Sequence, residues 1–242
     1  MQGARRLIFD IGMHNGDDTE FYLAKGFNVV AVEANPELVE AGKQRFAEPI
    51  AAGQLTIVQK AIADRQGTVT LYVNPGHTDW SSIYKDIATR DGVEVQEVQA
   101  QAVTITDLFR EYGVPYYAKI DIEKADRDAL MQMSRTTERP RFVSVEAHDI
   151  SYLTYLRDMG YNRFKVVNQA NYWWFKCPAE ALEGEALPEW KFTIHSSGPF
   201  GEETPGRWLD FESAAYLYLQ ARQISVENDF MLNQWMDFHA AA

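Results

Sequence analysis

Two short segments of the sequence each end in residues that could act together in acid–base chemistry. Asp121 and Glu123 occur in "AKIDIEKAD", and Glu146 and His148 occur in "FVSVEAHD". Side chains two residues apart along a strand point to the same side of a sheet. If the two strands are neighbours, the four side chains converge at the carboxyl edge of that sheet. An imidazole beside carboxylates can there remove a proton from a bound hydroxyl group.

We therefore expect His148 to be a general base, with Glu146 or Asp121 orienting it or the acceptor hydroxyl. The same region could instead hold Mg²⁺ or Ca²⁺ through the oxygen atoms of Asp121, Glu123, Glu146 and Asp149. In a third interpretation, Glu123 and Asp149 cap helices and pair with nearby basic side chains. The sequence leaves these alternatives open.

A second set of residues that could do chemistry lies in "FDIGMHNGDDTEFYLAKGFNVVAVEANP", residues 9–36. Asp10 ends one apolar run and Glu33 ends the next, and the loop between them holds Gly12 and Gly16. Glycines let the chain turn sharply and let a ligand approach the backbone. An acid at the tip of a second strand can accept both hydroxyls of a ribose. The pattern therefore favours a ligand that contains adenosine.

The charge of this loop distinguishes between adenosine ligands. A dinucleotide needs the spacing G-x-G-x-x-G to cradle its pyrophosphate on backbone N–H groups, whereas the loop has G-x-x-x-G. Asp10, Asp17 and Asp18 would each repel a pyrophosphate by about 1 kcal/mol or more at close range. They suit S-adenosylmethionine, which carries a sulfonium and an ammonium group. An NAD(P)-dependent oxidoreductase and a non-catalytic module that binds an adenosyl ligand are the alternatives.

The elements that must position these residues alternate between strands and helices. Short apolar runs that fit parallel strands buried on both faces occur at residues 6–11, 28–33, 55–62, 116–122 and 141–146. Helical patterns occur at residues 18–25, 36–48, 106–112, 125–133, 149–159 and 210–224. This alternation predicts an α/β fold, with a mostly parallel doubly wound sheet and helices on both faces.

The rest of the chain adds less regular elements. We expect an extra strand at 67–74, an inserted loop or flap at 74–100, and closing strands in "YNRFKVVNQ" and "WKFTIHSSG". No linker or repeat interrupts the sequence. We therefore expect a single domain over residues 1–242, with a cofactor-binding core at 6–170 and a C-terminal extension or cap at 171–242.

The composition limits the partners and the compartment. The 35 acidic residues outnumber the 23 basic ones, giving a formal charge of -12. Such a surface repels phosphate backbones and anionic lipids, so neither nucleic acid nor a membrane is an expected partner. The single cysteine, Cys177, fits a reducing compartment. The N-terminus enters a strand at once and no apolar run is long enough to span a bilayer, so we expect a cytoplasmic protein.

The tryptophans have two interpretations. They could form an apolar or sugar-stacking acceptor pocket, or they could fill a core or a homo-oligomer interface, which is the commoner case. The residues concerned are Trp80, Trp173, Trp174 and Trp208.

Taken in order, these motifs resemble the FkbM family of S-adenosylmethionine-dependent methyltransferases. "FDIGMHNGDDT" is similar to the family's "DxGxNxGxDT", "VVAVEANPEL" to "VxAxEPNP", and "AIADRQGTVTLYV" to "AxxDxxGxxxLYV". "AKIDIEKADRDAL" is similar to "KIDxEGxExxxL", and "FVSVEAHD" to the strand after it. The similarity covers roughly residues 6–170. Two residues depart from it: Lys124 replaces a glycine, and His14 stands at a usual asparagine.

The resemblance implies a Rossmann-like class I methyltransferase that transfers a methyl group from S-adenosylmethionine to an oxygen of a small molecule or glycan. It implies that Glu33 holds the ribose. The other cofactor contacts that it implies are Asp10, Gly12, His14, Asn15, Gly16, Thr19, Ala34, Asn35, Ala61, Ile62 and Asp121. The change at Lys124 bears on the turn near the acceptor, and the change at His14 on how the methionine end is held.

Overall fold

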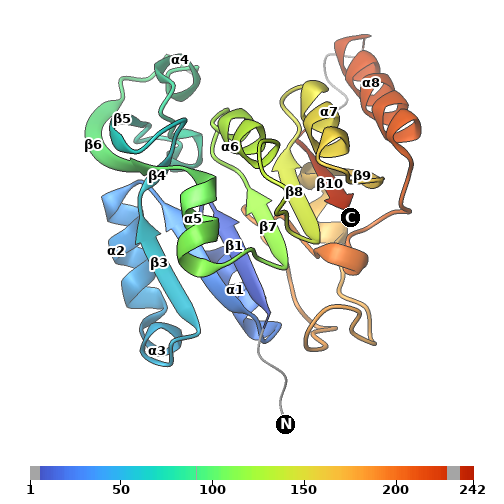
Figure 1. The fold of residues 1–242 in the computed structure, drawn as a ribbon, viewed down its shortest axis with the longest axis horizontal. Coiled ribbons are helices and arrows are strands. Elements are labelled where there is room, and N and C mark those ends of the chain that lie inside the picture. Colours follow the sequence, from blue (N-terminus) through green and yellow to red (C-terminus); the bar gives the residue numbers. More distant parts are fainter. Residues whose placement is uncertain (1–5, 91, 228–234) are drawn as a thin grey trace.

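The computed structural model describes residues 6–90, 92–227 and 235–242. Its centre is a seven-stranded sheet in the order β3-β2-β1-β7-β8-β10-β9 (Figure 1). The strands are β1 (Leu7–Ile11), β2 (Asn28–Glu33), β3 (Leu55–Gln59), β7 (Tyr117–Ile120), β8 (Phe142–Glu146), β9 (Arg163–Asn168) and β10 (Met236–Ala241). All neighbouring pairs from β3 to β8 are parallel, and β10 is antiparallel to both β8 and β9. The expected mostly parallel sheet is confirmed.

Helices cover both faces of this sheet, as the sequence predicts. Residues of α5 (Ile105–Tyr112), α6 (Asp126–Met133), α7 (Ser151–Asp158) and α8 (Phe211–Glu227) share one core cluster with Phe9 and Ile11 of β1. Figure 1 shows α5 and α6 on the near side of the sheet. Ile8 of β1 belongs to the cluster on the opposite face, where α1 (Asp17–Ala24), α2 (Pro36–Arg45) and α3 (Ala47–Ala51) pack. Alternate residues of one strand thus serve two cores.

Local sequence signals set where two of these helices begin. Asn35 caps α2, because its Oδ1 accepts a hydrogen bond of 3.0 Å from the backbone N–H of Glu37, and Pro36 is the first helical residue. Thr104 and Asp107 form a reciprocal capping box at the start of α5. These caps fix the chain directly after β2 and β6, beside the cleft described below.

A second, three-stranded sheet corrects one sequence expectation and confirms another. It has the order β4-β6-β5, with β4 (Ala61–Ile62), β5 (Gly67–Val73) and β6 (Gln96–Val103). The single strand expected at 55–62 is therefore wrong, since β3 ends at Gln59 and β4 pairs with β6. The strand at 67–74 is confirmed as β5.

The loop expected at 74–100 is also wrong in part. It contains the 3-10 helix η1 (Thr78–Trp80), the helix α4 (Lys85–Ala88) and the start of β6. The sequence "QEVQAQAV" hid β6 because its outward residues are Gln and Glu and two of its inward residues are only Ala.

The C-terminal part closes the sheet in an unexpected way. The strand expected in "WKFTIHSSG" is wrong, because residues 190–198 contain no strand. The aromatic residues there pack on α1 instead, with the Phe192 ring centroid 5.0 Å from that of Phe21. The strand expected in "YNRFKVVNQ" is confirmed as β9, and β10 lies between it and β8. The single domain over 1–242 stays a prediction, although β10, from the 171–242 segment, is part of the core sheet.

One face of the sheet carries a row of polar residues in register. They are consecutive partners across β1, β7, β8, β10 and β9, and all are buried: Asp10, Lys119, Ser144, His239 and Lys165. Because side chains alternate, the same face carries the residue two positions towards the carboxyl edge on each strand. The five buried residues form an inner polar row. Asp121, Glu146 and Asp237 form an outer row at the carboxyl ends of β7 and β8, and part of this row belongs to the candidate site.

Candidate active site

A cleft opens at the carboxyl ends of β1, β2 and β7, against the smaller sheet. Seven predicted cofactor residues line it: Gly12, His14, Glu33, Ala34, Ala61, Ile62 and Asp121. The opposite wall includes Thr78, Asp79, Ser81 and Ser82 from the segment around η1. The structure therefore brings the glycine loop, the tip of β2 and the end of β7 together.

The two loop glycines are required by close packing. Gly12 has a φ of +89°, and a Cβ there would lie 1.8 Å from the backbone oxygen of Asp121. Gly16 has a φ of +86°, and a Cβ there would lie 2.5 Å from the ring of Phe46. No larger residue fits either position without a shift of the backbone or of a buried ring. Gly12 therefore lets the loop after β1 press against the end of β7.

Glu33 is held in place at the tip of β2 by the backbone. Its Oε2 accepts a hydrogen bond of 2.9 Å from the N–H of His14, and its Oε1 accepts one of 2.8 Å from the N–H of Asn35. Burial raises the pKa of Glu33, and these N–H groups act in the opposite direction. Each carboxylate oxygen keeps a second lone pair for a ligand. Glu33 is thus oriented to accept hydrogen bonds from a diol in the cleft.

A buried lysine that the sequence interpretation did not single out organises the floor of the site. The Nζ of Lys119 donates a 3.0 Å hydrogen bond to the backbone oxygen of Gly12. It also lies 3.6 Å from Asp10 Oδ1, 3.5 Å from Asp18 Oδ2 and 3.4 Å from Asp121 Oδ2. One positive charge thus faces three carboxylates. Of the three loop acids expected there, Asp10 and Asp18 face this lysine, whereas Asp17 pairs with Arg45 at 2.9 Å.

Two of these carboxylates are fully withdrawn from solvent. Burial raises the pKa of Asp10, and it raises that of Asp18 to about 7, while Lys119 opposes both shifts. Thr19 donates a 2.5 Å hydrogen bond to Asp10, and the N–H of Ser197 donates one of 2.8 Å to Asp18. Neither Asp10 nor Thr19 lines the cleft. They support its floor instead of lining the space for a ligand.

The remaining predicted loop residues shape the loop. His14 has a φ of +50°, and its Nε2 lies 2.9 Å from Thr78 Oγ1 across the cleft. Asn15 exchanges hydrogen bonds with Asp17 at the start of α1. Gly16 and Asn35 act through backbone packing and helix capping, and neither lines the cleft. The loop therefore carries two classes of residue, those that line the cleft and those that hold it open.

The predicted catalytic residues meet beside the cleft, because β7 and β8 are neighbours. The Nε2 of His148 lies 2.8 Å from Glu146 Oε2 and 3.6 Å from Asp126 Oδ2. Burial lowers the pKa of His148. Glu123 does not pair with a basic residue nearby in the sequence, since both of its oxygens bind Arg90, at 2.6 and 3.2 Å.

The predicted metal ligands come together only in part. Among the residues that the structure describes, the group able to hold a cation is Glu123, Glu146 and His148, whose ligand atoms lie within 4.8 Å of one another. Asp149 is outside this group, and its Oδ1 accepts a 2.8 Å hydrogen bond from the N–H of Ser151 at the start of α7. Its environment matches the capping interpretation.

The turn after β7 shows how the departure at Lys124 affects the backbone. Glu123 and Lys124 have φ angles of +50° and +77°, a region that favours glycine. Asp126, another residue that the sequence interpretation missed, holds this turn by accepting hydrogen bonds from the N–H groups of Ile122 and Lys124, at 3.0 and 2.8 Å. The glycine that the family resemblance leads one to expect at 124 would therefore relieve backbone strain.

The tryptophans divide between the two interpretations of the sequence. Trp173 and Trp174 are 61% and 73% exposed, so they fill no part of the core. Trp208 packs partly buried against the core, and Lys165 Nζ lies 4.3 Å from its ring centroid. Trp80 stacks on His77, with a centroid distance of 4.0 Å. An aromatic acceptor pocket stays a prediction.

A family profile described as "Methyltransferase FkbM domain" matches residues 10–163. No curated protein matches. No helix among the described residues is both long enough and apolar enough to cross a membrane.

Solved structures of methyltransferases align with the chain at low identity. A methyltransferase FkbM from Methylobacillus flagellatus KT aligns with 15% identity and a TM-score of 0.45, over 68% of this chain and 40% of that chain. The METTL16 MTase domain aligns with 12% identity and a TM-score of 0.40, over 68% and 54%. An rRNA methylase from Streptococcus thermophilus aligns with 11% identity and a TM-score of 0.37, over 74% and 82%. The aligned part thus spans about half or less of the first two structures.

Proposed function

Because the chain belongs to the FkbM family of methyltransferases, we propose that it transfers the methyl group of S-adenosylmethionine to a hydroxyl oxygen of a small molecule or glycan. The observation that carries this proposal is Glu33, a carboxylate at the tip of β2 that two backbone N–H groups hold at the cleft. A carboxylate in that place can accept both hydroxyls of a ribose.

The residues of the cleft fit this cofactor. Gly12 lets the loop after β1 pack directly against Asp121, and both residues line the cleft, so a ligand can contact the backbone there. Ala61 and Ile62 offer an apolar wall on which an adenine ring can lie. Three carboxylates around the single charge of Lys119 favour the sulfonium and ammonium groups of the cofactor. When bound, the cofactor supplies an already activated methyl group, so the protein has mainly to position the acceptor.

The acceptor hydroxyl must lose a proton, and we assign that task to His148. Its lowered pKa leaves the imidazole neutral at pH 7, the form that can accept a proton. Nε2 lies 2.8 Å from Glu146 Oε2, and the two atoms form no hydrogen bond in the geometry of the free protein, so we assign the acceptor to Nδ1. The carboxylate of Glu146 would orient the ring and stabilise the imidazolium. The acidic surface of the protein supports a neutral or cationic acceptor over a nucleic acid.

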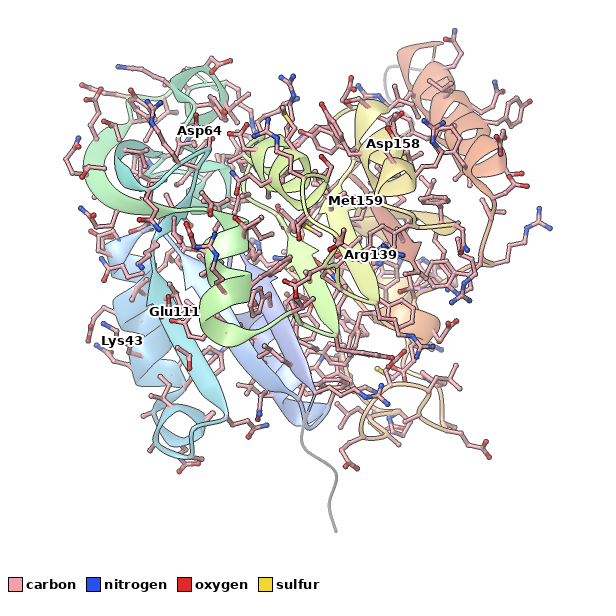
Figure 2. The ribbon with its side chains drawn as sticks, in the orientation of Figure 1. Lys43, Asp64, Glu111, Arg139, Asp158 and Met159 are labelled. Carbon is pink, nitrogen blue, oxygen red and sulfur yellow. The ribbon has the colours of Figure 1, made fainter. Side chains whose placement is uncertain are left out.

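Titration calorimetry with S-adenosylmethionine, S-adenosylhomocysteine and NAD tests the proposal. We expect the first two to bind and NAD to give no heat. Glu33→Gln should weaken the binding of S-adenosylmethionine by about 10- to 100-fold, because an amide replaces one acceptor oxygen. Glu111→Gln, on α5 and away from the cleft (Figure 2), is the matched control. Absence of heat with both adenosyl compounds, or preferential binding of NAD, would overturn the proposed function.

A further inference from the structure

The segment 190–198 of the C-terminal part lies against the start of α1, directly after the glycine loop. Two acids of α1 anchor this segment. Thr193 Oγ1 donates a 2.7 Å hydrogen bond to Asp17 Oδ2, and the backbone N–H of Ser197 donates one of 2.8 Å to Asp18 Oδ1. The chain between these two anchors is therefore held beside the loop that follows β1.

This anchoring brings His195 next to His14. The centroids of the two imidazole rings lie 5.1 Å apart, and the ring planes are tilted by 58°. His14 lines the cleft, and its Nε2 lies 2.9 Å from Thr78 Oγ1 on the opposite wall. His195 is itself exposed, so its ring is open to a ligand. Two imidazoles from distant parts of the chain thus meet at the edge of the cleft.

The proposed cofactor carries one negative group, the carboxylate of its methionine end. The acids on the floor of the site attract the sulfonium and the ammonium group of the cofactor, but they repel this carboxylate. The Nζ of Lys119 faces three of these acids and donates to the backbone oxygen of Gly12, so its hydrogen bonds are already directed to the protein. The carboxylate therefore needs a separate hydrogen-bond donor.

The histidine pair is the donor group best placed for that carboxylate. Among the described residues that line the cleft, the basic side chains are those of His14 and Lys60. Lys60 directly precedes the apolar wall assigned to the adenine ring, which is the other end of the cofactor. In the tautomer in which Thr78 donates to Nε2 of His14, Nδ1 carries the proton and can donate it to a ligand. The ring nitrogens of His195 add a second donor beside it.

We propose that His195, together with His14, binds the carboxylate of S-adenosylmethionine, so that the C-terminal part of the chain supplies a residue of the cofactor site. The inference rests on the proposed function. The family profile ends at residue 163, so His195 belongs to the part of the chain that the profile does not match. Burial lowers the pKa of His14, and this ring therefore acts as a neutral N–H donor at pH 7.

Titration calorimetry with S-adenosylmethionine and decarboxylated S-adenosylmethionine tests this inference, because the two ligands differ only in the carboxylate. The wild-type protein should bind the decarboxylated ligand about 10-fold more weakly. His195→Ala should weaken the binding of S-adenosylmethionine by about 10-fold and that of the decarboxylated ligand by about twofold or less. His195→Gln, which keeps an N–H donor, should recover most of the loss. Lys191→Ala, an exposed basic residue of the same segment that does not line the cleft, is the control and should change neither affinity.

Two results would overturn this inference alone. One is that the wild-type protein binds both ligands equally well, and the other is that His195→Ala weakens both equally or neither. If His195→Ala fails to fold, the two ligands compared in the wild-type protein and in His195→Gln decide. Absence of heat with S-adenosylmethionine in the wild-type protein would overturn the proposed function and this inference with it, so the two failures are distinguishable.

Discussion

Replacing Lys119 by methionine removes the one positive charge at the centre of the buried acids. Its Nζ lies 3.4–3.6 Å from oxygens of Asp10, Asp18 and Asp121 and donates to the backbone oxygen of Gly12. Methionine is of similar length and fills irregular space well, so the main change is in charge and hydrogen bonding. The variant therefore isolates the electrostatic contribution of this lysine.

The size of the effect follows from opposing contributions. At an effective dielectric constant of 20, each pair at about 3.5 Å attracts by roughly 5 kcal/mol, and the desolvation of Lys119 offsets a large part of the total. Breaking a buried ion pair by removing one partner costs about 3–5 kcal/mol. We expect Lys119→Met to lower the free energy of unfolding by about that amount at pH 8. Asp18 loses its charge as the pH falls through about 7, so at pH 5.5 we expect a loss of about 2 kcal/mol or less.

The sign follows from Asp18. Its pKa in the folded protein, about 7, lies above the value of 3.8 for the unfolded chain. The stability from its bound proton is fully present below pH 3.8 and is lost as the pH rises through about 7. Without Lys119 this pKa rises further, so the variant gains more from acidification than the wild-type protein does.

Urea denaturation followed by tryptophan fluorescence at pH 5.5 and 8.0 measures both losses. Lys43→Met, on the exposed side of α2 (Figure 2), is the control, since its side chain is 50% exposed. An equal loss at the two pH values, or a loss under about 1 kcal/mol at pH 8, would refute the electrostatic reasoning.

Three further predictions concern single residues. Gly12→Ala places a Cβ 1.8 Å from the oxygen of Asp121, so it should lower stability by about 3 kcal/mol or more and abolish cofactor binding in calorimetry; wild-type values for both would contradict the packing argument. Lys124→Gly relieves a φ of +77°, and thermal unfolding should show a gain of about 1 kcal/mol; a lower melting temperature would mean that no strain is stored there. Burial lowers the pKa of His239 to about 3, so the unfolded chain binds its proton first and the wild-type protein loses about 1.4 kcal/mol per pH unit as the pH falls below 6.5. His239→Leu should remove this loss, seen as the difference between the two urea-unfolding profiles from pH 4 to 7, and parallel profiles would count against a buried neutral imidazole.

The sequence predicted correctly those strands and helices whose limits follow from one local signal. β1 and β2 are apolar runs buried on both faces, and Pro36 after Asn35 marks the start of α2, so their limits were found within one residue. The prediction missed β6 because its exposed face of Gln and Glu hides the alternation with small inward residues. The segment 190–198 failed because bulky aromatic residues mark burial without specifying a strand.

The site residues that could be predicted from the sequence are those at the end of an apolar strand. Glu33, Asp121 and Glu146 could be found in that way. The surroundings of Lys119 and Asp237 could not be predicted, because they depend on which strands are neighbours. Lys119 is a charged residue within an apolar run, and this local signal could have marked it as a residue in need of partners. Asp237 carries no local signal beyond its place in "WMDFHA", and its register with Glu146 comes from the insertion of β10 beside β8.

The inner and outer polar rows differ in whether they contain cationic side chains. This difference indicates where a positive charge from a ligand would be most favourable. The inner row contains its own cations, since Lys119 faces Asp10 and Lys165 lies at the far end of the row. The outer row consists of Asp121, Glu146 and Asp237, and contains none. A sulfonium beside Asp121 would offset part of this charge. Because charges attract more strongly where water is excluded, the burial of these acids would strengthen their attraction for a cationic cofactor.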